Sequence, residues 1–145
     1  MNLAKVMDQF YYNMALTELR LINENKMYAN ITYNSMRYLD FIVYTENCTV
    51  SRLADLFHVS KAAVTIKVNE LCRMGLVEKV QSEEDRRIYY LTVPPHVAEE
   101  YARYDRILVR AAERLEGKYS KQEIEQFCKM LTDFGTFYKK GENHE

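Results

Sequence analysis

Hydrophobic or small residues recur every three or four positions in three segments of the chain, a spacing typical of one face of an α-helix. Near the N-terminus the repeating residues are Leu3, Met7, Phe10, Met14, Thr17 and Leu21. After two consecutive prolines they are Val97, Tyr101, Tyr104, Leu108, Ala111 and Leu115. In the C-terminal segment they are Ile124, Phe127, Leu131, Phe134 and Tyr138. The pattern predicts amphipathic helices at both ends of the chain.

The expected ends of these helices carry typical capping residues. Pro94 and Pro95 suit a first helical turn, where the N–H that proline lacks is not needed. Gly117 is expected to end this helix in a left-handed conformation. Ser120 and Glu123 have the spacing of a capping box, which predicts that the last helix begins there.

Two arrangements fit helices that flank a small middle module. They can pack on one another within a single chain as a bundle, or they can join two copies of the chain. Because the module between them offers little surface to cover the hydrophobic stripes, the sequence favours a homodimer.

The middle of the chain predicts three short helices. The first runs from Tyr33 to Val43. Thr49 can cap a second helix, and Ser60 can cap a third that Gly75 ends. Two helices joined by so tight a turn form a helix-turn-helix. Its interior is expected to contain Leu53, Ala54, Phe57, Val59, Ala63, Val64, Val68, Leu71 and Cys72.

The outward face of the third helix is mostly polar and basic, and it holds Lys61, Ala62, Thr65, Ile66, Lys67, Asn69 and Arg73. Lys61, Lys67 and Arg73 stand against Glu70, an excess of two positive charges. Short side chains near a helix N-terminus can reach the edges of DNA bases while the backbone lies close to phosphates. The alternative is the solvated lysine-rich face of an ordinary helical hairpin. The residues expected to contact DNA are Ser60, Lys61, Ala62, Thr65, Lys67 and Arg73.

A β-hairpin is predicted directly after this helix. Residues 76–80 and 88–93 alternate between apolar and polar positions, as strands do. The polar loop between them ends in Arg86 and Arg87, and arginines at the tip of such a wing can enter a narrow minor groove. Asp85 is expected to pair with an arginine and to hold the shape of the loop rather than touch DNA.

Between residues 31 and 93 the sequence resembles the MarR family of winged-helix transcriptional regulators. The flanking helices match that family in pattern and placement. The resemblance implies a homodimer joined by its terminal helices, a winged helix in each subunit, a palindromic DNA operator, and release of DNA when an effector binds. It is carried by residues 49–57, Ser60-Lys61-Ala62-Ala63-Val64-Thr65, residues 71–77, and Asp85-Arg86-Arg87 before Leu91-Thr92.

The resemblance also suggests roles by position. Arg87 and Asp85 match the arginine and aspartate of the family's wing motif, and Arg86 occupies its variable position. His58 stands where turns of this kind often carry glycine. Histidine tolerates a positive φ better than most residues, so the turn is expected to form with some strain. The residues that fall on the DNA-facing part of the family's recognition helix are Ser60, Lys61, Thr65 and Lys67.

Composition restricts the class of protein. Of the 145 residues 48% are hydrophobic and 28% are charged, and there are only 4 glycines and 2 prolines, which favours a mostly helical globular chain. The net charge of −1 gives no overall attraction to a polyanion, although a local basic face is sufficient for nucleic acid. Nothing approaches the roughly 18 uninterrupted apolar residues of a membrane span, so no membrane partner is expected.

Other chemistry has little support in the sequence. His58, His96 and His144 lack the spacing of metal ligands, and neither a glycine-rich phosphate loop nor a nucleophile elbow occurs, so no enzyme, metal or cofactor is expected. The 12 tyrosines can line a pocket for a small aromatic or amphipathic effector, although ordinary packing explains each one more simply. The three cysteines, Cys48, Cys72 and Cys128, are widely separated and odd in number, which fits the reduced thiols of a cytoplasmic protein. Cys72 and Cys128 are expected to be small core residues, with oxidant sensing as an alternative.

The sequence thus predicts a mainly α fold with a small β-hairpin wing, a winged helix-turn-helix flanked by N- and C-terminal dimerisation helices. One domain spans residues 1–145, with dimerisation helices in 1–30 and 94–140 and the DNA-binding region in 31–93. The expected function is a homodimeric regulator that binds a palindromic double-stranded DNA operator, as a repressor released by a small effector. The alternative is a winged helix that binds a protein and no DNA.

Overall fold

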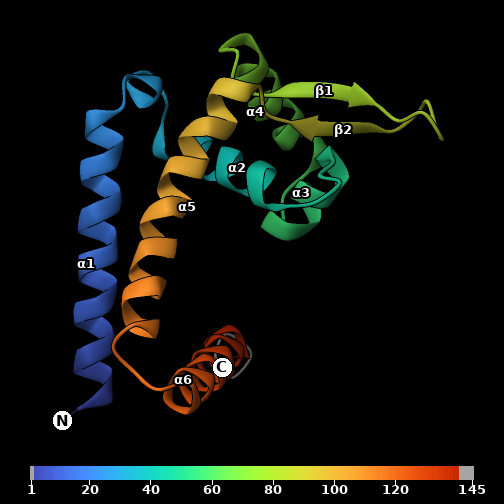
Figure 1. The fold of residues 1–145 in the computed structure, drawn as a ribbon. Helices are drawn as coiled ribbons and strands as arrows, with labels where there is room; N and C mark the ends of the chain where they lie inside the picture. Colours follow the sequence, from blue (N-terminus) through green and yellow to red (C-terminus); the bar gives the residue numbers. More distant parts are fainter. Residues whose placement is uncertain (1, 141–145) are drawn as a thin grey trace. The chain divides into compact units, whose positions relative to one another are not determined.

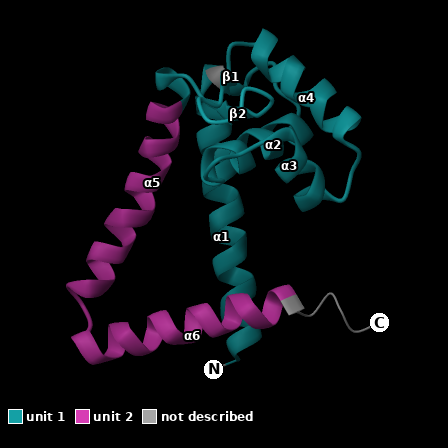
Figure 2. Cartoon of the chain, turned by 90° about the vertical axis from the view of Figure 1, so that its right-hand side faces the viewer, with its two compact units in different colours: residues 1–97 teal, residues 98–145 magenta. Residues whose placement is uncertain are grey.

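A computed structural model describes residues 2–140 of the chain. The chain divides into two compact units, residues 1–97 and residues 98–145, and each is described by itself (Figure 2). The mainly helical fold with one two-stranded hairpin confirms the predicted fold class. The elements are α1 (Leu3–Glu24), the 3₁₀ helix η1 (Lys26–Tyr28), α2 (Tyr33–Tyr44), α3 (Val50–Phe57), α4 (Lys61–Arg73), β1 (Glu78–Gln81), β2 (Tyr89–Thr92), α5 (Pro95–Glu116) and α6 (Lys121–Lys140) (Figure 1).

The core of the first unit lies between α2, α3 and α4. Leu53 of α3 and Val68 of α4 are fully buried, as their positions in the hydrophobic pattern predicted. The ring of Phe57 contacts the rings of Tyr38 and Phe41, at centroid distances of 4.7 and 4.9 Å. Burial of apolar surface contributes about 25 cal/mol per Å², so this core is the main force that holds α4 in place.

Two residues that were expected in this interior are exposed instead. Val59 is 42% exposed, because it follows a left-handed residue that turns the chain away from α3 before α4 begins. Ala63 is also exposed. Since Val64 and Val68 define the buried face of α4, Ala63 lies about 100° around the helix from that face, in its first turn.

The predicted caps are present. Thr49 Oγ1 accepts a hydrogen bond at 3.1 Å from the N–H three residues later, and Ser60 Oγ does the same at 3.1 Å. The capping box of α6 is complete, because the Ser120 N–H donates to Glu123 Oε2 at 2.9 Å and the Glu123 N–H donates to Ser120 Oγ at 3.4 Å. These bonds satisfy N–H groups that would otherwise lack an intrahelical partner.

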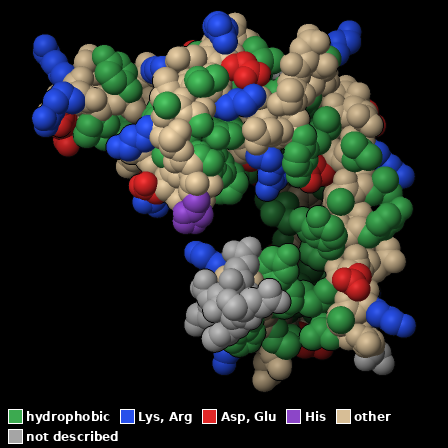
Figure 3. All heavy atoms as spheres, turned by 180° about the vertical axis from the view of Figure 1, so that it is seen from behind, with side chains coloured by type: hydrophobic (Ala, Val, Ile, Leu, Met, Phe, Trp, Pro, Cys, Tyr) green, Lys and Arg blue, Asp and Glu red, His purple; other side chains and the backbone are tan. Residues whose placement is uncertain are grey.

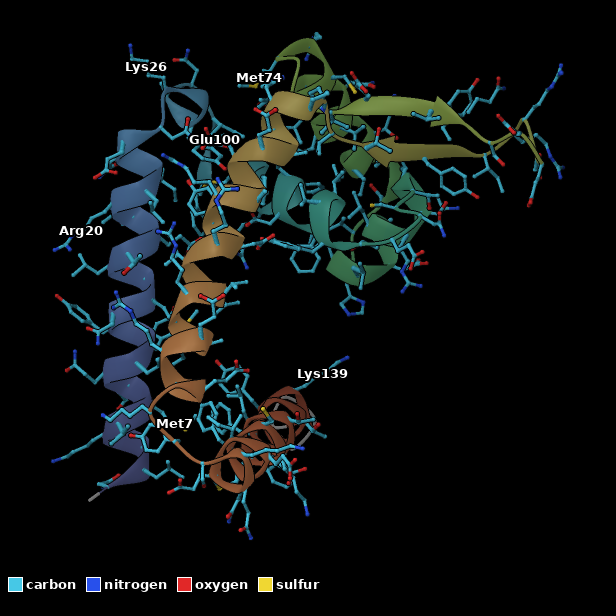
Figure 4. All side chains as sticks on the ribbon, viewed as in Figure 1. Met7, Arg20, Lys26, Met74, Glu100 and Lys139 are labelled. Carbon is cyan, nitrogen blue, oxygen red and sulfur yellow. The ribbon has the colours of Figure 1, made fainter. Side chains whose placement is uncertain are left out.

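His58 makes the turn of the helix-turn-helix in the left-handed conformation that its position suggested. Its φ is 53° and its ψ is 43°, and Val59 N–H donates back to the Ala54 carbonyl at 3.1 Å. The helix α4 ends at Arg73, and Met74 is its C-cap residue (Figure 4). Gly75 follows with a φ of 70°.

The end of α5 needs no left-handed residue, so the prediction that Gly117 adopts a left-handed conformation there is wrong. The φ of Gly117 is not positive, and its N–H donates to the Glu113 carbonyl at 2.9 Å, continuing the helical pattern. The N–H groups of Lys118 and Tyr119 both donate to the Leu115 carbonyl at 3.0 Å. These bonds satisfy the Glu113 and Leu115 carbonyls, two of the last four of α5, without a left-handed cap.

The hairpin forms the predicted wing, with shorter strands than expected. β1 and β2 are antiparallel, with Lys79 opposite Leu91 and Gln81 opposite Tyr89. Leu76 and Val77, expected in the first strand, lie before it and are buried. The Leu91 N–H donates to the Cys48 carbonyl at 2.8 Å, so the segment before α3 is tied to β2.

A polar cluster, which we call the Ser35 cluster, links the start of α2 to the middle of α4. Ser35 is fully buried, and its Oγ donates to Glu70 Oε1 at 3.3 Å. It accepts hydrogen bonds from Thr32 Oγ1 at 2.9 Å and from the Lys67 ammonium at 3.2 Å. Lys67 also forms an ion pair of 3.0 Å with Glu70 Oε2. The buried hydroxyl therefore has a full set of partners, which is the condition under which a buried polar group does not destabilise a fold.

The three long amphipathic helices form as predicted, and their hydrophobic stripes are largely uncovered. In the described chain α1 has no buried residue, and its Arg20 projects away from the helix (Figure 4). Leu108 of α5 and Leu131 of α6 are among the exposed large hydrophobic residues. No helix within residues 2–140 has the length and apolar content needed to cross a membrane.

The left-handed residue in the turn gives a first prediction. His58 is exposed, so its replacement removes few contacts. A left-handed conformation costs an L-residue roughly 1 kcal/mol and costs glycine almost nothing. The variant His58→Gly should therefore be more stable than His58→Ala by about 1 kcal/mol in urea unfolding. An alanine variant as stable as the glycine variant would contradict the strained turn.

The Ser35 cluster gives a second prediction, on pH. The hydrogen bond from Lys67 holds the pKa of Glu70 below its usual value. A lowered folded-state pKa stabilises the fold above the unfolded pKa of about 4.3, and that stabilisation is lost as pH falls through the folded value. Glu70→Gln should lower the urea midpoint at pH 7, with a difference from the wild type that shrinks toward pH 3. Glu83→Gln, in an exposed loop, is the matched control and should leave the midpoint at pH 7 unchanged. A Glu70 effect of equal size at both pH values would exclude the charge as its cause.

Candidate nucleic-acid interface

The outward side of α4 forms one continuous face, which we call the α4 face. Its members lie on positions separated by three or four residues, opposite the buried stripe of Val64, Val68 and Leu71. Ile66 is 66% exposed on this face. The Thr65 hydroxyl donates to the Lys61 carbonyl at 2.8 Å, so it presents an acceptor outward. The α4 face consists of Lys61, Ala62, Thr65, Ile66, Asn69 and Arg73.

The first turn of α4 suits a phosphate group. Ser60 caps the helix and there is no acidic residue in its first turn, while Lys61 is its first residue. The free N–H groups and the positive end of the helix dipole both favour an anion at such a terminus. The predicted contacts Ser60, Lys61 and Ala62 therefore lie together at the end of the helix where a phosphate would bind.

Lys67 differs from the other predicted contacts. Its side chain is about a quarter exposed, and its ammonium is already bound in the Ser35 cluster. A phosphate contact would require Lys67 to leave Glu70 and Ser35. The sequence did not reveal this partnership, because Ser35 is far away in the chain and its serine hydroxyl carries no sequence signal of a buried ion pair. Its contact with DNA stays a prediction.

The wing loop holds Arg87 in a defined orientation. The Asp85 Oδ1 atom accepts hydrogen bonds from the Arg87 backbone N–H at 3.0 Å and from its Nε at 3.1 Å, and Oδ2 accepts from Nη2 at 3.0 Å. The Arg87 side chain is nevertheless 89% exposed. The paired arginine lowers the pKa of Asp85 and the aspartate raises the pKa of Arg87, so both groups are charged at neutral pH. The other N–H groups of the guanidinium remain for a ligand.

The rest of the loop is held together by hydrogen bonds to and between backbone groups. The Gln81 amide donates to the Arg86 carbonyl at 2.6 Å, and the Ser82 N–H donates to the Ile88 carbonyl at 2.9 Å. The buried Ser82 hydroxyl accepts from the Asp85 N–H at 3.3 Å. Lys and Arg side chains gather at the free end of the hairpin (Figure 3). The wing therefore presents Arg86 and Arg87 on a well-connected loop.

One link joins the wing to the α4 face. The Lys79 ammonium, on β1, donates to Asn69 Oδ1 at 2.7 Å. The sequence pattern placed Asn69 on the outward face of the helix and Lys79 in the strand, but it could not show that the two meet.

Two cysteines have the chemistry of core thiols. Burial raises the pKa of Cys48 to about 11, and burial also raises the pKa of Cys72. Both thiols are therefore protonated at neutral pH, which disfavours thiolate chemistry. Cys128 is exposed, in contrast to the core position predicted for it. No group of three possible metal ligands occurs within residues 2–140, and His144 lies outside the described residues.

Parts of the sequence are similar to a known protein family and to a known regulator. The model of the MarR family matches residues 29–88, which run from before α2 to the end of the wing loop. The HTH-type transcriptional regulator BilQ of Clostridioides difficile (strain CD3) is 27% identical over 94 residues, or 65% of this chain. That match spans 64% of BilQ, which is less than two thirds of the relative's length.

Solved structures extend the likeness to the terminal helices. Streptococcus pneumoniae FabT, in complex with DNA, matches with a TM-score of 0.70 at 24% identity over 94% of each chain. The adhesin competence repressor AdcR of Streptococcus pyogenes matches with a TM-score of 0.61 at 22% identity, over 95% of this chain and 98% of AdcR. Identities this low show a shared fold. Together with the family match, they show that residues 29–88 are similar to the MarR family and that the chain shares the fold of these solved structures.

Proposed function

We propose that the chain is a transcriptional regulator that binds double-stranded DNA in a sequence-specific manner. The observation that carries the proposal is the combination of the exposed polar α4 face with an arginine wing that Asp85 orients. A helix of this width and polarity fits the major groove, and an arginine at a wing tip fits the neighbouring minor groove. FabT, which shares the fold, was solved in complex with DNA.

In this proposal α4 is the recognition helix. Lys61 and Arg73 contact phosphates from either end of the helix, and the N–H groups of its first turn add a further phosphate contact. Thr65 and Ala62 are short enough to let the helix lie close to the base edges. Lys67 takes part only if it leaves the Ser35 cluster.

The wing supplies a second, preorganised contact. Ordering a free arginine side chain costs an estimated 0.5–1.5 kcal/mol on binding. Because two hydrogen bonds to Asp85 already fix the Arg87 side chain, part of this cost is met before DNA binds. Arg86, which is exposed beside it, adds positive charge at the same place. The carboxylate of Asp85 acts on the shape of the wing.

The protein would act as a homodimer in the cytoplasm. The exposed hydrophobic stripes of α1, α5 and α6 need a cover, and a second copy supplies one by symmetry. A two-fold dimer reads an inverted repeat, with half-sites about one helical turn of DNA apart. In this proposal the protein represses transcription, and it releases DNA when it binds a small aromatic or amphipathic effector.

A winged helix that binds a protein partner is the competing function. Such a module needs an exposed face on α4, but it has no need for an arginine wing held by an internal carboxylate. The basic wing thus favours DNA.

The proposal predicts enrichment of an inverted repeat. The folded protein would be incubated with a random pool of DNA duplexes at near-physiological salt, and bound duplexes would be amplified and sequenced. Enrichment of one inverted repeat supports a DNA-binding dimer. A folded dimer that enriches nothing, tested both as purified and after refolding to remove a bound effector, would favour the protein-binding alternative.

The wing predicts a change in the salt dependence of binding. Removing one charged side chain from a phosphate flattens the plot of log affinity against log salt by about one unit. Arg87→Ala should therefore weaken operator binding and flatten the slope by about one unit per wing. Lys129→Ala removes the same charge from exposed α6 and is the matched control, with an unchanged slope. An Arg87 variant with the wild-type slope and affinity would remove the wing from the proposed interface.

A further inference from the structure

A single large hydrophobic side chain stands on the otherwise polar α4 face. Ile66 is 66% exposed, whereas Val64, Val68 and Leu71 on the opposite side of the helix are fully buried. The core is therefore complete without Ile66. An exposed isoleucine is common on protein surfaces, but this one occupies the centre of the face proposed to enter the major groove.

The spacing around Ile66 is that of base-reading residues. Ala62, Thr65, Ile66 and Asn69 stand at positions i, i+3, i+4 and i+7 of α4, the same spacing at which residues of other recognition helices contact bases in the major groove. Such positions share one side of the helix and reach a few neighbouring base pairs. Ile66 is thus placed to meet a base edge rather than a phosphate.

The surroundings of Ile66 form a shallow hollow of mixed polarity. It is lined by Ile66, Asn69, Cys72 and Arg73. The side chains of Ile66 and the protonated, half-buried Cys72 give it an apolar wall, and Asn69 and Arg73 give it a polar rim. A group that fits this hollow is small and apolar and carries hydrogen-bond acceptors beside it.

The orientation of the Asn69 amide limits which group of a DNA base can bind beside Ile66. Its Oδ1 accepts a hydrogen bond from the Lys79 ammonium at 2.7 Å, and an ammonium has only donors, so the oxygen of the amide must face Lys79. The NH₂ group of Asn69 is left for a ligand. Beside Ile66 the α4 face therefore offers donors, from Asn69 and from the guanidinium of Arg73, to an acceptor on the base.

We propose that Ile66 recognises the C5-methyl group of a thymine in the major groove of each half-site, with Asn69 donating to an acceptor on the same or the next base. In the major groove thymine presents a methyl group next to its O4 acceptor, a pair of groups that no other unmodified base shows. This inference rests on the proposed function and names the base that the recognition helix selects.

The test replaces each thymine of the selected operator, one at a time, by deoxyuridine, which lacks only the methyl group. At one thymine of each half-site the wild-type protein should bind the uracil duplex about fourfold more weakly, the factor expected for burial of one methyl group. Ile66→Ala should bind both duplexes equally at that position and keep the wild-type response at every other thymine. Because Ile66 is exposed, this variant should unfold at the same urea concentration as the wild type.

Lys61→Ala is the matched control on the same face. It should weaken binding of both duplexes while keeping the ratio between them, since a phosphate contact does not sense the methyl group. The inference is overturned if the operator half-site contains no thymine, if no thymine is sensitive to loss of its methyl group, or if Ile66→Ala keeps the full ratio. A protein that enriches no operator overturns the proposed function, and this inference with it.

Discussion

The orientation of α4 is the constraint on which the proposed interface depends. Val64, Val68 and Leu71 bury one side of the helix, and this burial alone decides which residues face outward. Polar links then act at its two edges. The Ser35 cluster ties Lys67 and Glu70 to α2, while Lys79 of the hairpin ties Asn69 from the other direction. A hydrophobic stripe resists tilting of the helix, and hydrogen bonds at its edges resist rotation about its axis.

The basic residues of the winged helix differ in their partners, and this difference matters more than their number. The net charge of the chain is −1, so no general attraction concentrates it on DNA. Among its basic groups, Lys67 is half-buried and bound to Glu70 and Ser35, whereas Arg87 pairs with Asp85 and yet remains almost fully exposed. One pair links two helices of the core, and the other orders the wing loop. Counting lysines and arginines in the sequence could not separate these two uses.

The sequence predicted what depends on local chemistry. The caps at Thr49 and Ser60 and the left-handed turn at His58 follow from side chains within three residues, and all were found where expected. The same reasoning was wrong about Val59, because a turn redirected the chain, and about Gly117, because helical hydrogen bonds continued through it.

Contacts between distant segments were beyond the reach of the sequence. The Ser35 cluster and the bond between Lys79 and Asn69 join different elements, and periodicity places residues on faces without saying which faces meet. The same limit applies to the candidate site. Its outward helix residues and its wing arginines were named from the pattern, whereas the bond from Lys67 to the distant Ser35 was visible only in the fold.

The connection from the wing to the first turn of α5 is short and anchored. Only Val93 and Pro94 separate β2 from α5, and the ring of proline fixes one of the few free dihedral angles in that connection. Val97, in the first turn of α5, is fully buried. The short connection and the buried Val97 therefore anchor the first turn of α5 to the winged helix. Lys79, on the strand that pairs with β2, donates to Asn69 of α4, so the hairpin is joined both to the start of α5 and to the proposed recognition helix.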